Sequence, residues 1–116
     1  MSTTLFDLST ELARLETDLG ATSEALVGAL AVNLRALQRW RKADALPQAD
    51  SRARLQALIS LRDRLNDTFA SPEAVRSWMQ QPHRMLGGLT PLGAVTVGRL
   101  DAIDRVLEAL DSGIFV

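Results

Sequence analysis

The sequence predicts an all-α protein that forms one small domain, or two lobes sharing a core. Apolar residues recur at helical spacing along the chain, beginning with Leu5, Leu8, Leu12, Leu15 and Leu19. Ser, Thr or Asn precedes several of these stripes as a helix cap, and Gly or Pro follows them. No segment alternates apolar and polar residues strongly enough to predict a strand.

Four helices are expected in the first 70 residues. The leucine stripe ends at Gly20, which suits a C-cap. Thr22 or Ser23 caps a short second helix, Asn33 caps a third, and Pro47 separates the third from a long fourth helix. The apolar residues expected on the second, third and fourth helices are Leu26, Val27 and Leu30; Leu34, Leu37 and Trp40; and Leu55, Leu58, Ile59, Leu65 and Phe69.

The remaining residues are expected to form shorter helices separated by glycine and proline. Ser71-Pro72-Glu73 combines a cap, a proline at the first helical position and an acid in the first turn. Thr90-Pro91 repeats the cap and proline, and a last helix from about Arg99 carries Leu100, Ile103, Leu107 and Leu110. A soft boundary near residue 70 predicts two parts, 1–70 and 71–116.

Composition and short motifs exclude several classes of protein function. The chain of 116 residues has no cysteine and a single histidine, His83, so neither a disulfide framework nor a protein-held metal is expected. No apolar run reaches the ~20 residues of a membrane span. The start "MSTTLFDLST" lacks the basic and apolar regions of a signal peptide, so a cytoplasmic protein is expected. We find no catalytic cluster or phosphate-binding loop, so neither an enzyme nor a cofactor is expected.

Charge is distributed unevenly. Residues 33–64 carry eight Arg and Lys against three Asp, whereas residues 1–32 carry one Arg against five acids. A basic middle is consistent with an anionic partner such as nucleic acid, and equally with ordinary solvated helix faces.

Residues 22–43 have the dimensions of a helix-turn-helix, although no glycine marks the turn. Arg35, Gln38, Arg39 and Lys42 share one helix face. The Arg and Gln side chains suit base edges in the major groove, while Arg41 and Lys42 suit phosphates. These five residues predict an operator-DNA interface; the alternative is an amphipathic surface helix. A single module binds weakly, so a repressor of this kind would have to dimerise.

The second candidate site lies after residue 71. The apolar side chains of Trp78, Met79, Met85, Leu86, Leu89 and Leu92 exceed what short helices need, which indicates either shared core or an interface. Gly113 stops the last helix, and the apolar Ile114-Phe115-Val116 follows it. These three residues are expected either to fold back on their own core or to fill a partner's pocket.

Trp78, Pro82, "LGGLTPL" (86–92), Gly98 and the final "GIFV" together resemble the C-terminal toxin-binding domain of the MbcA/ParS/Xre antitoxin family. "RALQRWRKADALP" (35–47) resembles the Xre-like DNA-binding half of the same family. One departure is Gly93, where many relatives have an acid; this change should weaken the start of its helix.

The resemblance implies an antitoxin that blocks the active site of a RES-domain, NAD-degrading toxin and represses its own operon. It also implies a homodimer or a larger hetero-oligomer with the toxin. The toxin-binding residues expected on this basis are Trp78, Arg84, Met85, Leu86, Gly113, Ile114, Phe115 and Val116. The alternative is a stand-alone helix-turn-helix regulator whose C-terminal half only dimerises.

Overall fold

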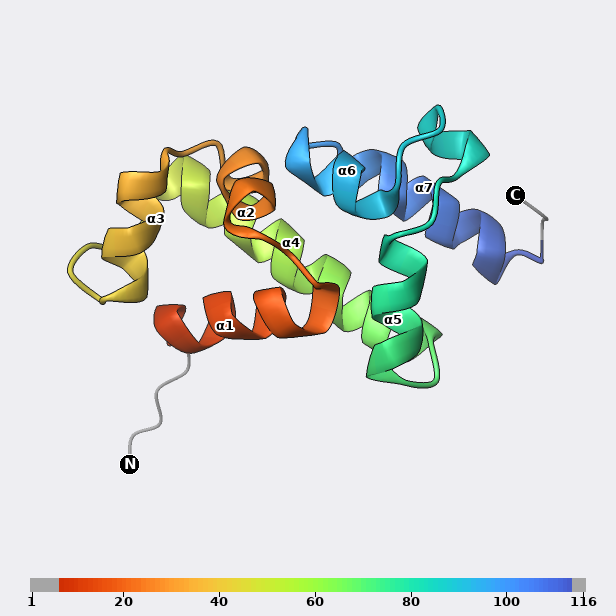
Figure 1. The fold of residues 1–116 in the computed structure, drawn as a ribbon, viewed down its shortest axis with the longest axis horizontal. Coiled ribbons are helices and arrows are strands. Elements are labelled where there is room, and N and C mark those ends of the chain that lie inside the picture. Colours follow the sequence, from red (N-terminus) through yellow and green to blue (C-terminus); the bar gives the residue numbers. More distant parts are fainter. Residues whose placement is uncertain (1–6, 114–116) are drawn as a thin grey trace.

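The structure is a computed structural model that describes residues 7–113, and every regular element in this range is helical. The expected all-α class is therefore confirmed. The elements follow the order α1 (Leu8–Leu19), α2 (Ser23–Leu30), α3 (Leu34–Arg41), α4 (Ala49–Thr68), α5 (Pro72–Met79), the 3₁₀ turn η1 (Arg84–Leu86), α6 (Pro91–Thr96) and α7 (Leu100–Asp111). The long α4 passes between α1–α3 at one end of the molecule and α5–α7 at the other (Figure 1).

The predicted caps begin their helices. The side-chain oxygens of Thr22, Asn33, Ser71 and Thr90 accept hydrogen bonds from backbone N–H groups three residues on, at 2.8–3.1 Å. Such bonds satisfy N–H groups that have no partner inside the helix. The bond from Thr90 reaches the N–H of Gly93, so the capped start of α6 forms despite the glycine at that position.

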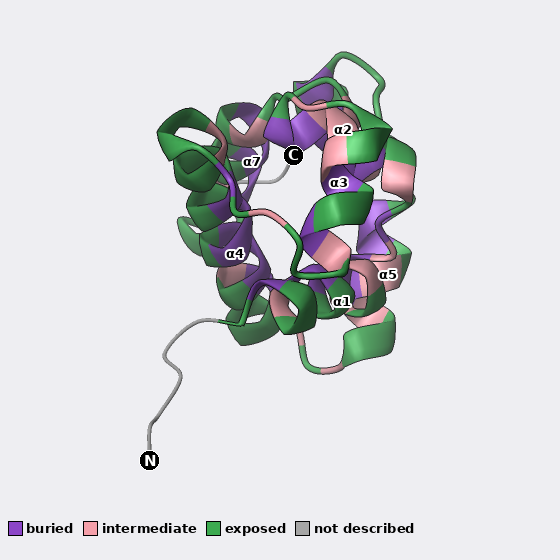
Figure 2. Ribbon diagram, turned by 90° about the vertical axis from the view of Figure 1, so that its left-hand side faces the viewer, coloured by how far each residue is buried: buried purple, intermediate pink, exposed green. Residues whose placement is uncertain are grey.

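One hydrophobic cluster runs through the whole described chain. Its fully buried members include Leu15 and Leu30 before residue 70, and Met79 and Leu107 after it. Figure 2 shows the buried stretches of several helices turned toward the interior. Both predicted parts, 1–70 and 71–116, therefore contribute to a shared core, and the division between them stays a prediction about their roles.

The most extensive contact between helices joins α2 to α6, and a glycine makes it possible. A Cβ atom on Gly28 would lie 1.8 Å from the backbone oxygen of Thr96. Only a residue without a side chain allows the two backbones to come this close. The contact places the helix that precedes α3 directly against the C-terminal helices.

A buried arginine ties α4 to α1. Arg62 donates hydrogen bonds to Glu11 at 2.7 Å and to Asp63 at 2.9 Å. Burial opposes the charge on Arg62, but these two hydrogen bonds and the two negative charges raise the pKa of its guanidinium above the ordinary value. The ion pair therefore compensates for the burial of the charge, as a buried cation requires.

Two apolar residues of the predicted helices are exposed. Leu34 was predicted to face inward, but it is 48 % exposed. At 100° per residue it lies 120° around α3 from Trp40, at the edge of the buried stripe. Leu110, in the last turn of α7, is 36 % exposed. Within residues 7–113, no helix has the length and apolar character needed to span a membrane.

Candidate partner-binding surfaces

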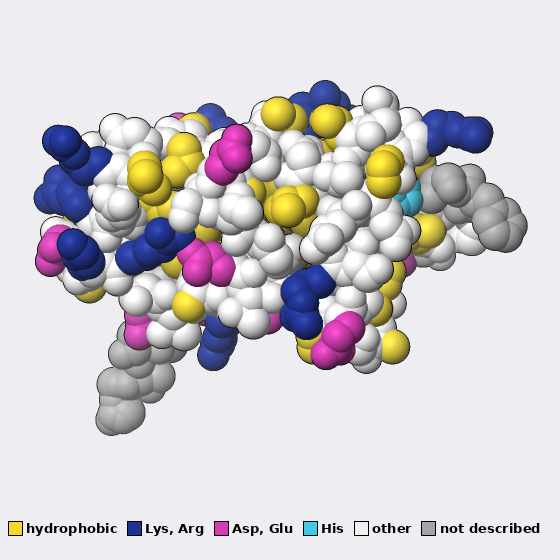
Figure 3. Space-filling model, viewed as in Figure 1, with side chains coloured by type: hydrophobic (Ala, Val, Ile, Leu, Met, Phe, Trp, Pro, Cys, Tyr) yellow, Lys and Arg dark blue, Asp and Glu magenta, His cyan; other side chains and the backbone are white. Residues whose placement is uncertain are grey.

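The first candidate surface is the outer face of α3. The short helices α2 and α3 are joined by residues 31–33, where Ala31 takes the left-handed conformation, with φ 59°. Alanine thus occupies a turn position at which glycine is more usual. Arg35, Gln38, Arg39 and Lys42 are all exposed. At 100° per residue they span an arc of about 100°. Basic side chains gather at the end of the molecule where α3 lies (Figure 3).

Arg41 faces a different direction from these four residues. Its guanidinium forms an ion pair with Glu16 of α1 and donates a hydrogen bond to the Ser23 hydroxyl at 3.1 Å. The side chain therefore links α3 to α1 and α2. Of the five residues predicted to contact DNA, four share an exposed face and Arg41 contributes to the fold.

The second candidate surface is built on buried aromatic packing. The Trp78 ring lies 5.4 Å from the Phe69 ring and 5.1 Å from the His83 ring, centroid to centroid. These spacings are typical of favourable aromatic pairs. Trp78 is only 9 % exposed, and Met79 beside it is fully buried. Trp78 and Met79, at the end of α5, therefore both belong to the core. They fix the start of the chain segment that follows.

That segment is a compact loop between His83 and Leu89. The His83 N–H donates to the Leu89 carbonyl, and the Gly88 N–H donates to the His83 carbonyl, both at 3.0 Å. Gly87 and Gly88 have φ of 66° and 90°, conformations that suit glycine. Leu86 is buried, whereas Arg84 and Met85 on the same turn are exposed. The loop thus uses Leu86 as its anchor and presents the two neighbouring side chains to solvent.

The predicted toxin-binding residues therefore divide by burial. Trp78 and Leu86 are buried, Arg84 and Met85 are exposed, and Gly113 is exposed with φ 77° beyond the end of α7. Ile114, Phe115 and Val116 lie outside the described residues. Two exposed neighbours were absent from the predicted set: Leu89, which is 43 % exposed, and Arg99. The adjacent glycines predicted a loop, but not which side chains it exposes.

Charged groups border this surface at the start of α7. The carboxylate of Asp101 lies 3.2 Å from Arg105 Nη2 and 3.8 Å from Arg99 Nε. Desolvation raises the pKa of Asp101, but Arg105, Arg99 and the N–H of Ala102 outweigh it and hold that pKa below the ordinary value. Asp101 is therefore ionised at neutral pH and shared between two arginines.

Three comparisons with known proteins agree with this architecture. Residues 64–113 match the family model described as the antitoxin Xre/MbcA/ParS C-terminal toxin-binding domain. The mycobacterial cidal antitoxins MbcA of Mycobacterium tuberculosis and Mycobacterium bovis are 28 % identical over 98 residues, which are 84 % of this chain and 86 % of theirs. An uncharacterised protein of Sinorhizobium fredii, y4oB, is 30 % identical over 74 residues, which are 64 % of this chain and 57 % of that one.

The fold has also been observed in a solved structure. The crystal structure of the Mycobacterium tuberculosis MbcT–MbcA toxin–antitoxin complex contains a chain that superposes with a TM-score of 0.67. That superposition covers 97 % of this chain and all of the other, at 24 % identity.

Fold and sequence matches together assign this chain to the antitoxins, proteins that act by binding rather than by catalysis. Within that class, residues 64–113 match the toxin-binding domain of the Xre/MbcA/ParS antitoxins, and the chain is similar to the MbcA antitoxins over most of its length. The matched domain begins at residue 64, inside α4, so the last five residues of this helix belong to it together with α5, η1, α6 and α7.

Proposed function

We propose that this antitoxin neutralises a RES-domain, NAD-degrading toxin by covering its active site. The observation that carries the proposal is the exposed apolar and basic surface of Arg84, Met85 and Leu89, which lies within the matched toxin-binding domain. Burial of the apolar side chains of Met85 and Leu89 against a partner favours association. The positive charge of Arg84 adds specificity for that partner. MbcA of Mycobacterium tuberculosis has been crystallised in a toxin–antitoxin complex with MbcT.

The residues after Gly113 complete the proposal. The apolar side chains of Ile114, Phe115 and Val116 follow a helix that ends at Asp111, at an exposed glycine. An aromatic anchor inserted in a pocket is a common source of binding energy. The proposed role of these three residues is to enter the toxin's active site.

Co-expression with a RES-domain toxin from the neighbouring gene tests the proposal. Full-length antitoxin should restore growth and cellular NAD⁺. A chain ending at Ser112 should fail to do so, although it still binds the toxin through the surface at residues 84–89. A chain of full length with three serines in place of residues 114–116 is the matched control for length. Protection of NAD⁺ by the truncated chain would refute the role of the tail.

We also propose that α3 contacts operator DNA, because four polar or basic side chains share its exposed face. Arg35→Ala and Arg39→Ala should each weaken operator binding by about 1–3 kcal/mol if they contact bases. Arg54→Ala is the matched control, since Arg54 is an exposed arginine on α4. Equal affinity of all three variants and the unmodified protein, measured at one salt concentration, would remove α3 from the DNA interface.

A further inference from the structure

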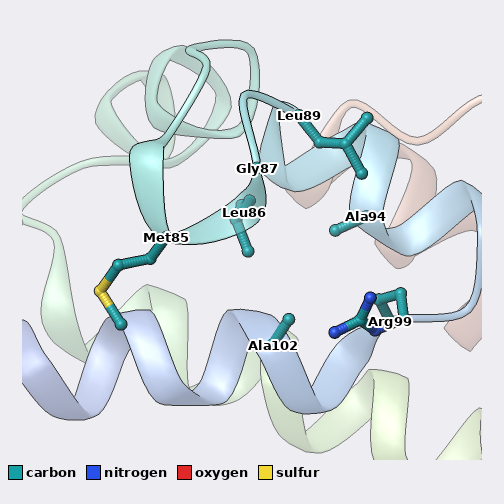
Figure 4. A pocket seen from close by; sticks show the side chains of 7 residues that line it. All are labelled: Met85, Leu86, Gly87, Leu89, Ala94, Arg99 and Ala102. Carbon is teal, nitrogen blue, oxygen red and sulfur yellow. The ribbon is translucent and has the colours of Figure 1, made fainter.

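A pocket with a cavity volume of about 230 Å³ lies between η1, α6 and α7. Its lining residues are Met85, Leu86, Gly87, Leu89, Ala94, Arg99 and Ala102. Figure 4 shows Met85 at one end of the pocket, Arg99 at the other, and Ala102 on the helix below. Apart from Arg99, every lining side chain is apolar or absent.

The size of the pocket suits one side chain. An apolar cavity of about 150 Å³ admits benzene, whereas sites for small-molecule ligands usually measure about 300–1,000 Å³. Leu86, Ala94 and Ala102 are at most 7 % exposed and form its buried lining, while Met85 and Leu89 are 45 % and 43 % exposed. An unbranched methionine adapts its shape to an incoming group. The pocket is therefore shaped for a single aromatic or aliphatic side chain.

Arg99 adds a requirement for negative charge. Its Nε lies 3.8 Å from Asp101, beyond hydrogen-bond distance, and Asp101 lies closer to Arg105. The guanidinium can therefore offer its planar N–H groups to a second carboxylate. An apolar side chain next to an acidic group would satisfy both ends of the pocket.

Residues 114–116 of the same chain contain apolar side chains but cannot reach the Arg99 end. From Ala102 to Gly113, α7 and its cap lead away from the pocket for about 16 Å at 1.5 Å per residue. Three extended residues span at most about 10 Å. An occupant that pairs with Arg99 therefore does not come from residues 114–116.

We propose that this pocket receives one apolar side chain of the toxin, with an adjacent carboxylate of the toxin paired to Arg99. All seven lining residues lie within residues 64–113, the segment matched to the toxin-binding domain. The proposal rests on the proposed function, and it adds a second anchor, separate from the tail, with the toxin side chain inserted into the antitoxin.

Calorimetric titration with the purified toxin subunit tests the pocket by filling it. Ala102→Leu should weaken toxin binding at least about 30-fold, the effect of losing one strong anchor. Ala109→Leu is the matched control: the same change on the same face of α7, two turns further on and outside the pocket. It should change the affinity less than about 3-fold. Equal losses from both variants would overturn the proposal.

Charge reversal tests the second requirement without filling the pocket. Arg99→Glu should weaken binding by at least about 10-fold at low salt, whereas Arg105→Glu, with the same change in net charge, should have a much smaller effect. The Arg99→Glu variant also keeps the proposal testable if Ala102→Leu fails to fold. Equal effects of the two reversals would overturn the assignment of Arg99.

Methyl-labelled methionine locates the contact directly. On addition of the toxin, the Met85 methyl signal should shift while that of the fully buried Met79 stays in place. A Met85 shift that depends on antitoxin concentration alone would show that a second copy fills the pocket, which overturns the proposal. Absence of any toxin binding by the unmodified chain would refute the proposed function itself. Binding that all pocket variants retain would refute only the pocket.

Discussion

Replacing Gly28 with alanine tests how α2 is joined to α6. The new Cβ would lie 1.8 Å from the Thr96 carbonyl oxygen and 2.8 Å from its carbonyl carbon. Since such contacts do not fall below 3.0 Å, the Cβ and the oxygen must separate by about 1.2 Å. The obstacle is backbone, which cannot rotate away as a side chain would. The helices themselves must therefore shift.

The expected cost combines two opposing effects. Alanine is favoured over glycine inside a helix by about 1 kcal/mol. Overpacking costs about 1–3 kcal/mol and sometimes more, and a backbone obstacle calls for the upper part of that range. We therefore expect the free energy of unfolding to fall by about 2 kcal/mol. For a domain of this size, that corresponds to a fall in Tm of about 8 °C.

Urea and thermal unfolding followed by circular dichroism measure this change. Gly93→Ala is the matched control, because Gly93 is also helical and its nearest obstacle is the Thr90 hydroxyl at 3.2 Å, a side-chain atom. The control should stay within about 1 kcal/mol of the unmodified protein. If Gly28→Ala proves as stable as the unmodified protein, the close approach of α2 and α6 is wrong.

Three further predictions concern stability. Arg62→Met should cost about 3 kcal/mol, because Glu11, which is largely buried, then keeps only its longer pair with the exposed Arg14 at 3.6 Å. Urea unfolding should show most of that loss recovered when Glu11→Leu is added, and an additive loss would contradict this account. Burial raises the pKa of Asp104 although Arg64 lies nearby, so the folded state binds this proton more tightly and its stability falls as pH rises through the folded-state pKa. When the free energy of unfolding is measured across pH, Asp104→Asn should therefore gain stability relative to the unmodified protein above about pH 4. A loss of stability relative to the unmodified protein in that range would contradict the predicted pH dependence. Trp78→Ala should cost about 3–5 kcal/mol in unfolding free energy, and a cost below 1 kcal/mol would be incompatible with a core role.

Local chemistry predicted the helices well. Thr22, Asn33, Ser71 and Thr90 each begin a helix by accepting a backbone hydrogen bond, and Gly20 ends α1 with φ 70°. A cap requires only residues within one helical turn, so the sequence contains all the information that decides it. The same holds for the leucine stripe of α1, whose described members are all buried.

Features that depend on distant residues were not predicted. Arg41 was assigned to phosphates because it is basic, but the position of Glu16 on α1 determines where its guanidinium points. Gly28 was not identified as a packing residue, because its role exists only where Thr96 approaches it. Arg62 is similar, since its burial depends on how α1 lies across α4. The pocket at Arg99 and Ala102 likewise requires three elements to meet.

The residues that carry the family resemblance have mainly structural roles in this chain. Trp78 is core, Gly87 and Gly98 hold left-handed turns, and Thr90 with Pro91 begins α6. A pattern made of such residues describes how the domain folds, and it leaves the exposed side chains between them free to vary without loss of the fold. Since specificity is a difference between affinities for alternative partners, it must arise from groups that touch the partner. We therefore expect antitoxins with the same pattern to choose among toxins through exposed positions such as Met85.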